Sequence, residues 1–78
     1  MMQTLDLHGL RFEEAHEAVT RFVDRLYYQE AECGRIIHGF GVIAGALPQW
    51  LAAYPFVTRW ARDLHNAGST MVWVDAAR

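Results

Sequence analysis

Two histidines, each followed by a glycine, are the residues of this sequence best suited to chemistry. His8 follows the run Leu5-Asp6-Leu7, and His38 follows Ile36-Ile37. A strand, a crossover helix and a second parallel strand need about 30 residues or slightly more, which matches the separation of the two histidines. Ligands of open α/β sheets bind at the carboxyl ends of the strands. We therefore expect His8 and His38 to face one pocket.

Asp6 precedes His8 by two residues, so on an extended strand both side chains point to the same face. A carboxylate in that position can orient an imidazole or raise its pKa, which is how a histidine base is usually held. The alternative is an aspartate that caps the turn through Gly9, with His8 simply placed at a strand end. Taken alone, the Asp-x-His pattern favours the capping role.

The segment His38-Gly39-Phe40-Gly41 connects a predicted strand to a predicted helix. Glycines in such a turn let backbone N–H groups approach a phosphate, and the helix end adds partial positive charge. With Asp6 and His8 at the same edge, the parts resemble those of a phosphodiester-cleaving site, in which one imidazole accepts a proton and the other donates one. The candidate catalytic residues are Asp6, His8 and His38, and the candidate phosphate-binding residues are Gly9, Arg11, Gly39 and Gly41.

Other residues of these types have simpler interpretations. Arg11 could clamp a phosphate, but a solvated surface arginine is the plainer reading. Trp60 and Trp73 lie on neighbouring predicted strands and would stack bases if they shared a face, although large aromatics in a small domain more often belong to a core or an interface. His16 and His65 have no evident partner and are interpreted as structural. A zinc site is not expected, because the chain has 1 cysteine and no i,i+4 histidine pair.

The elements that must position these residues follow the order β-α-β-α-β-β. A long amphipathic helix carries its apolar stripe on one side and acidic and basic residues on the other, and Glu17 and Arg21 form an i,i+4 pair on the polar side. We predict strands over 3–7, 35–37, 57–61 and 70–75, helices over 12–31 and 46–53, a glycine-rich loop over 39–45 and a turn over 66–69. The economical assembly is a two-layer α/β sandwich, a four-stranded mixed sheet with both helices on one face.

Length and composition narrow the class of protein. The 78 residues suffice for one domain, 1–78, and no signal peptide or membrane-spanning stretch is visible. The single cysteine, Cys33, suits a reducing compartment, so we expect a cytoplasmic protein. The net charge of −2 is unlike that of proteins that bind nucleic acid mainly by counterion release. The sequence does not indicate an oligomeric state.

With these residues identified, the chain resembles the small MutS-related (Smr) domain family over nearly all of its length. Leu5-Asp6-Leu7-His8-Gly9-Leu10 matches the family's opening Leu-Asp-x-His-Gly motif. His38-Gly39-Phe40-Gly41 matches its His-Gly-x-Gly motif at the expected distance, and the segment from Leu47 to Val57 resembles the second helix and following turn of small bacterial members.

This resemblance implies a sandwich like the C-terminal domain of translation initiation factor three. It also implies an endonuclease that cleaves RNA or nicks DNA, with DNA, RNA or ribosomes as partners. Asp6 and His8 fall on the first functional motif, and His38, Gly39 and Gly41 fall on the second. A divalent cation, Mg²⁺ or Mn²⁺, is left open as a cofactor, since water attack on DNA would need one whereas a 2′-hydroxyl would not.

The chain also departs from many relatives. It has Phe40 where they carry a basic or polar residue, Val42-Ile43-Ala44 where they carry Lys or Arg, and His65-Asn66 where they carry Gly-Gly. These differences reduce the electrostatic affinity for phosphates that we would otherwise expect. The alternative function is therefore a non-cleaving module that binds nucleic acid or ribosomes. A third possibility is an interaction domain that uses Trp60 and Trp73.

Overall fold

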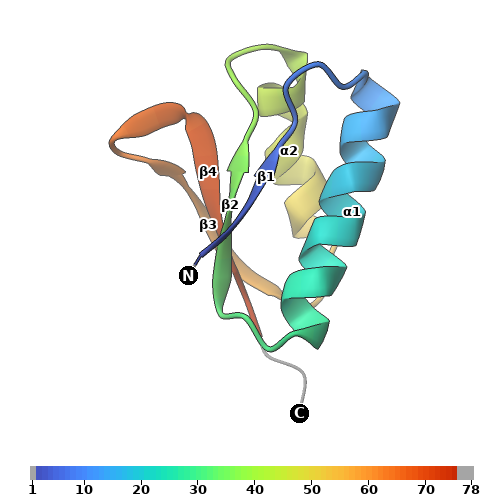
Figure 1. The fold of residues 1–78 in the computed structure, drawn as a ribbon, viewed down its shortest axis with the longest axis vertical. Coiled ribbons are helices and arrows are strands. Elements are labelled where there is room, and N and C mark those ends of the chain that lie inside the picture. Colours follow the sequence, from blue (N-terminus) through green and yellow to red (C-terminus); the bar gives the residue numbers. More distant parts are fainter. Residues whose placement is uncertain (1, 76–78) are drawn as a thin grey trace.

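Residues 2–75 form two helices and one sheet of four strands, in the predicted order. The structure is a computed structural model and describes residues 2–75. Its elements are β1 (Gln3–Asp6), α1 (Phe12–Tyr28), β2 (Cys33–Ile37), α2 (Val42–Ala52), β3 (Val57–Asp63) and β4 (Asn66–Val74). Both helices lie against the sheet, and the β3–β4 hairpin projects away from them (Figure 1). The predicted two-layer α/β sandwich is confirmed.

The sheet is mixed, and its strand order is β1-β2-β4-β3. β1 and β2 are parallel, and the last aligned pair is Asp6 with Ile37. β4 runs antiparallel to both β2 and β3. Because β1 and β2 are parallel and in register, the loops that follow them leave the sheet at the same edge.

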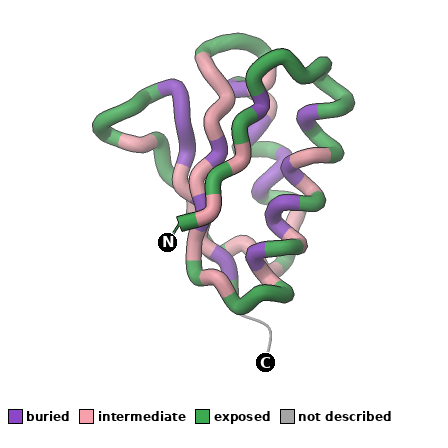
Figure 2. Tube along the Cα trace, viewed as in Figure 1, coloured by how far each residue is buried: buried purple, intermediate pink, exposed green. Residues whose placement is uncertain are grey.

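The core lies between the helices and one face of the sheet. Figure 2 shows buried residues along the side of α1 that faces the strands, while residues 8–11 after β1, residues 40–41 after β2 and the hairpin tip are exposed. The predicted stripe of α1 is buried from Ala15 to Leu26, but Phe12 remains 45% exposed and meets Trp50 edge-on. Gly34 is required by packing, since a Cβ there would lie 2.7 Å from the Phe22 ring. The main cluster consists of Leu7, Ala15, Val19, Phe22, Val23, Leu26, Ile36, Leu47, Trp50, Leu51, Val72 and Val74.

The helix boundaries differ from the prediction mainly at the end of α1 and at the start of α2. α1 ends at Tyr28, before the predicted end at 31, because Glu30 adopts a left-handed conformation with φ 57°. α2 begins at Val42, four positions before the predicted start at 46, so most of the predicted loop 39–45 is helical. Pro48 and Gly45 favoured the later start, because both residues disfavour a helix interior. The burial of Ala44, Leu47, Trp50 and Leu51 along α2 offsets that cost.

The predicted turn over 66–69 is wrong. The chain reverses at Leu64 and His65, β3 extends to Asp63, and Asn66 already belongs to β4. The register shifts between Arg62 and Asp63, where Arg62 aligns with Thr70 but Asp63 aligns with Asn66. Asn66 Oδ1 accepts the N–H of Gly68, a local hydrogen bond typical of turns. The turn-forming residues therefore produce an irregularity within a strand instead of the reversal itself.

Neither helix within residues 2–75 combines the length and the apolar character that a membrane crossing requires.

Candidate functional site

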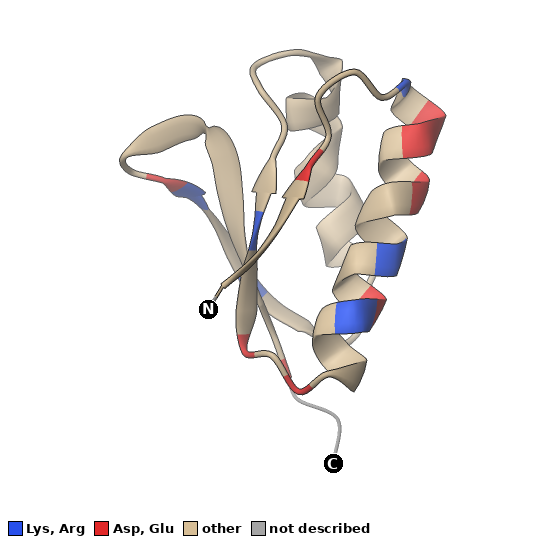
Figure 3. Ribbon diagram, viewed as in Figure 1, with Lys and Arg blue, Asp and Glu red and all other residues tan. Residues whose placement is uncertain are grey.

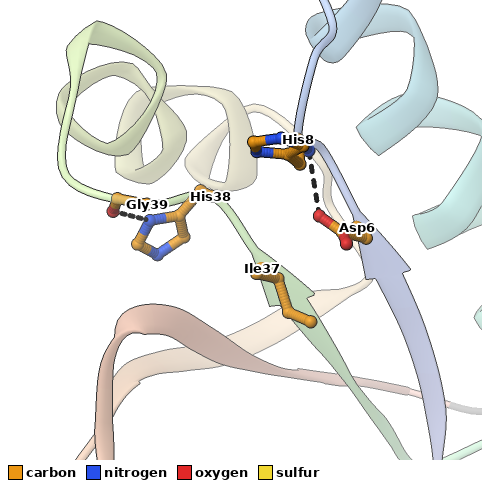
Figure 4. A pocket seen from close by; sticks show the side chains of 5 residues that line it. All are labelled: Asp6, His8, Ile37, His38 and Gly39. Carbon is orange, nitrogen blue, oxygen red and sulfur yellow. Dashed lines mark hydrogen bonds between the residues drawn. The ribbon is translucent and has the colours of Figure 1, made fainter.

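The two His-Gly pairs meet at the carboxyl edge of β1 and β2, as the sequence predicted from strand spacing. A pocket of about 140 Å³ lies there and is lined by Asp6, His8, Ile37, His38 and Gly39. In Figure 4, His8 continues from β1 and His38 from β2, and Ile37 points out from β2 between them. The pocket therefore brings together a carboxylate, two imidazoles and a glycine turn from two segments far apart in sequence.

Asp6 is linked to His8 through the backbone. Its Oδ1 accepts a hydrogen bond from the His8 backbone N–H at 2.9 Å, which is the capping geometry of the second interpretation above (Figure 4). Gly9 then turns the chain with φ 82°, a conformation that favours glycine, and Leu10 N–H bonds to the Leu7 carbonyl. The His8 side chain is exposed, and within residues 2–75 no hydrogen bond is recorded to its ring. Its imidazole is thus available to a ligand.

His38 is held at both ring nitrogens. Nδ1 lies 2.7 Å from the Gly39 carbonyl oxygen, and Nε2 lies 2.7 Å from Thr70 Oγ1. A carbonyl oxygen can only accept, so Nδ1 must carry the proton. In the neutral ring Nε2 then accepts a hydrogen bond from the Thr70 hydroxyl. The lone pair of His38 is therefore at Nε2.

The surroundings of His38 favour its neutral form. Burial lowers the pKa of His38 below its ordinary value of 6.5, and the positive charge of Arg62 lowers it further, while the bond to the Gly39 carbonyl acts in the opposite direction. A neutral imidazole at physiological pH is the form that accepts a proton. His38 is thus poised as a base more than as an acid.

The β3–β4 hairpin supplies partners that the sequence analysis missed. The carbonyl of Gly68 accepts the N–H groups of both His38 and Gly39 at 2.9 Å, and Thr70 contacts the His38 ring. Arg62 donates to the Ala67 carbonyl at 2.8 Å, which fixes the arginine on the same hairpin. The feature that could have identified these partners is the antiparallel pairing of the last strand with β2, which aligns Thr70 with Ile36 and Ser69 with Ile37. Without the strand order, those residues had no assigned neighbour.

The predicted phosphate-binding residues are dispersed around the pocket. Gly39 lines it and adopts φ 71°, and Gly41 is the N-cap of α2. Gly9 and Arg11 are exposed in the loop after β1 and do not line the pocket; Arg11 is the N-cap of α1, and its backbone N–H donates to the Glu14 carboxylate.

The two tryptophans do not form a shared stacking surface. Trp60 aligns with the buried Val72 and packs against the core, whereas Trp73 aligns with Arg59, one position along and therefore on the opposite face. The Arg59 guanidinium lies 3.9 Å above the Trp73 ring. Stacking of bases by both tryptophans on one face is therefore excluded, and the preferred reading of a core residue holds for Trp60. His16 stacks on Trp50 at 4.5 Å, and His65 lies in the hairpin turn.

Asp6 is the sole carboxylate among the residues lining this pocket. Within the described part of the chain, no group of three or more His, Cys, Asp or Glu side chains is arranged to hold a metal ion. A divalent cation bound here would therefore take Asp6 as its carboxylate ligand and would need most of its other oxygen ligands from substrate and water.

Comparison with known proteins places the chain in a family. The family model described as "Smr domain" matches residues 5–75. The chain is 42% identical over 78 residues to "Endonuclease MutS2" of Anaeromyxobacter sp. (strain Fw109-5), an alignment that covers 95% of this chain and 10% of the relative. It is 33% identical over 55 residues to "Ribosome rescue factor SmrB" of Shewanella sp. (strain W3-18-1), covering 68% of this chain and 31% of that protein. The chain thus spans only a minor part of either relative.

Solved structures share the fold. The Smr domain of Thermus thermophilus MutS2 superposes with a TM-score of 0.87 at 23% sequence identity, covering 94% of this chain and 98% of the other. YdaL, a stand-alone small MutS-related protein from Escherichia coli, gives a TM-score of 0.86 at 20% identity, covering 92% and 63%. At these identities the likeness establishes the arrangement of helices and strands.

Proposed function

The chain belongs to the Smr domain family, and from that premise we propose that it is an endonuclease that cleaves phosphodiester bonds at the carboxyl edge of β1 and β2. The observation that carries this proposal is the pocket lined by Asp6, His8, His38 and Gly39. A relative named for endonuclease activity, MutS2, aligns with 95% of the chain.

RNA is the substrate that best suits two histidines. The 2′-hydroxyl attacks the adjacent phosphorus while His38 Nε2 takes its proton, after the substrate hydroxyl replaces that of Thr70. The exposed His8 protonates the departing 5′-oxygen. The P–O5′ bond breaks as the P–O2′ bond forms, leaving a 2′,3′-cyclic phosphate and a 5′-hydroxyl.

Backbone groups would stabilise the negative charge on the phosphoryl oxygens during this step. Gly39 lines the pocket, and α2 begins three residues later at Val42, with an extended Gly41 as its N-cap and no acidic residue in its first turn. The free N–H groups and the partial positive charge of a helix N-terminus suit the phosphate oxygens. On DNA, which lacks the 2′-hydroxyl, water would have to attack, with a divalent cation held in part by Asp6.

The alternative is a module that binds nucleic acid or a ribosome without cutting. One observation favours it: both nitrogens of His38 are already engaged within the protein. The relative named as a ribosome rescue factor, SmrB, indicates ribosomes as one partner to test. Hydrogen bonds of catalytic groups often rearrange when substrate binds, so cleavage remains our first proposal.

The test is cleavage of end-labelled structured RNA and of supercoiled plasmid, side by side, in EDTA, Mg²⁺ or Mn²⁺. General acid–base catalysis contributes about 100- to 10,000-fold, so His8→Ala and His38→Ala should each reduce cleavage by at least about 100-fold. His65→Ala is the matched control, because His65 is an exposed hairpin histidine outside the pocket.

Undiminished cutting by the His8→Ala/His38→Ala double variant would refute the mechanism. Binding without cutting by the wild-type chain, on both substrates, would replace it with the non-cleaving module. Plasmid nicking that needs metal, with RNA left intact, would move Asp6 into the role of a cation ligand.

A further inference from the structure

Exposed apolar side chains occur in both loop segments that follow the pocket histidines. Among the described residues, seven large hydrophobic side chains are exposed, and four of them follow the two histidines in sequence. Leu10 and Phe12 lie after His8, and Phe40 and Val42 lie after His38, all at the carboxyl edge of β1 and β2. Single exposed apolar residues are ordinary, but several next to one pocket indicate contact with a ligand or partner.

Phe40 is the more exposed of the two aromatic residues in this group. It is 78% exposed and lies two residues beyond His38, in the turn that carries the pocket residue Gly39. Two residues of chain span at most about 7 Å, so the backbone of Phe40 lies within that distance of His38 and close to any phosphate held there. Beyond a phosphate, the next chemical groups of a nucleic acid are the neighbouring sugar and base.

The β3–β4 hairpin supports the turn that carries Phe40 through hydrogen bonds. The Gly68 carbonyl binds the N–H groups of His38 and Gly39, both at 2.9 Å. A Cβ built on Gly68 would lie 3.5 Å from Cε2 of Phe40, so one edge of the ring rests on the backbone of the β3–β4 hairpin. The rest of the ring faces solvent. An aromatic ring on a supported turn suits stacking, because little entropy is lost when a base covers it.

The charges nearby do not favour duplex binding. No Asp, Glu, Lys or Arg occurs in the sequence from Ile36 to Thr58, which includes the turn and all of α2. Figure 3 shows most charged positions along α1 and in the hairpin, while the loop from β2 into α2 carries none. Duplexes are gripped mainly through phosphates, whereas unpaired strands expose base faces that aromatic rings can cover.

We propose that Phe40 is a base-stacking subsite, and that the strand cleaved at this pocket is unpaired, with the base beside the scissile phosphate stacked on the Phe40 ring. This inference rests on the proposed function for the position of the phosphate. It goes beyond the proposed function in two respects. It specifies that the substrate is a single strand and not a duplex, and it attributes that selectivity to one side chain.

The experiment measures binding of a 2′-O-methyl oligonucleotide of mixed sequence that carries one 2-aminopurine, either single-stranded or annealed to its complement. The 2′-O-methyl groups remove the attacking hydroxyl, so binding is read without cleavage. Base–aromatic stacking is worth about 1–3 kcal/mol per base, so Phe40→Ala should weaken single-strand binding by roughly 5- to 150-fold and leave duplex binding unchanged.

Two further variants keep this test interpretable. Phe40→Tyr preserves the ring and should retain wild-type affinity and the fluorescence quenching of a 2-aminopurine at the stacked position. Leu64→Ala removes an apolar side chain that is 96% exposed at the hairpin turn, and it should change neither.

Wild-type single-strand affinity in Phe40→Ala, or an equal loss on single strand and duplex, would overturn the inference. Failure of the inference is separable from failure of the proposed function. Histidine-dependent cleavage with no effect of Phe40 would leave the function standing and remove the subsite. Phe40-dependent binding of unpaired strands without any cleavage would keep the subsite and remove the chemistry.

Discussion

Asp6 and His38 are held at the pocket by different kinds of contact. Asp6 Oδ1 binds the backbone N–H of His8 and so fixes where that residue leaves β1, whereas the His38 ring is fixed at both nitrogens. Spacing along a strand predicted that the side chains of Asp6 and His8 would lie on the same face, and both residues line the pocket. Spacing could not predict which atom of His8 the carboxylate binds, because that depends on the turn through Gly9.

The contact to the backbone gives Asp6 a positioning role that can be separated from a charge-dependent one. Asp6→Asn keeps an oxygen that can accept the His8 N–H, and it should retain most of the cleavage activity. Asp6→Ala loses a hydrogen bond worth about 0.5–1.5 kcal/mol, so kcat/KM should fall by roughly 2- to 10-fold.

The measurement is kcat/KM on single-stranded RNA for both variants, with thermal unfolding recorded to exclude general destabilisation. Equal and large losses of kcat/KM in Asp6→Asn and Asp6→Ala would contradict the positioning role. They would show that the negative charge of Asp6 acts on an imidazole or on a cation.

Among the elements, the β3–β4 hairpin contributes more to the site than its sequence suggested. It brings Gly68, Thr70 and Arg62 to His38, although none of these residues belongs to a His-Gly motif. Along β4, residues alternate, with Thr70, Val72 and Val74 on the buried side. The turn was placed too late because asparagine and glycine signal a local hydrogen-bond pattern, which here serves an irregularity inside β4.

Removing the charge of Arg62 should raise the pKa of His38, because the positive charge disfavours a protonated ring. A base works in its neutral form, so activity falls as the pH drops through its pKa. In the wild type, the acid limb of kcat/KM should lie below pH 6.5, since the pKa of His38 is lowered from that value. In Arg62→Gln, which can still donate to the Ala67 carbonyl, the limb should move to higher pH.

Proton NMR titration of the His38 ring provides the same comparison without activity. Arg59→Gln is the control, because Arg59 lies on the same strand and covers Trp73. An acid limb that does not move in Arg62→Gln, while the His38 ring titrates at a higher pH, would show that His38 is not the base.

At the scale of the whole molecule, the fold could be predicted because its signals are repeated and consistent. Two apolar runs ending in His-Gly, separated by one amphipathic helix, leave a parallel pair of strands as the simplest arrangement, and α1 and β2 follow that pattern closely. The start of α2 could not be predicted, because Gly45 and Pro48 are poor helix formers and only the packing of Leu47 and Trp50 against the core compensates for them.

At the same scale, the segment that follows β2 carries apolar groups and no cations. The chain has a net charge of −2, and its stretch from Ile36 to Thr58 has no charged residue. Under the proposed function, affinity for nucleic acid would come from the pocket, from stacking, or from other parts of a larger assembly. Selectivity for unpaired strands is consistent with that distribution of charge.

The most direct test of the account is the chemistry of the product ends. Single-stranded RNA is incubated with the wild-type chain in EDTA, and any product ends are compared with those from an oligonucleotide carrying one 2′-deoxy nucleotide at the cleaved position. We predict a 2′,3′-cyclic phosphate and a 5′-hydroxyl from RNA, and no cleavage at the 2′-deoxy position. A 5′-phosphate end, or equal cutting of the 2′-deoxy oligonucleotide, would contradict histidine acid–base chemistry on a 2′-hydroxyl at this site.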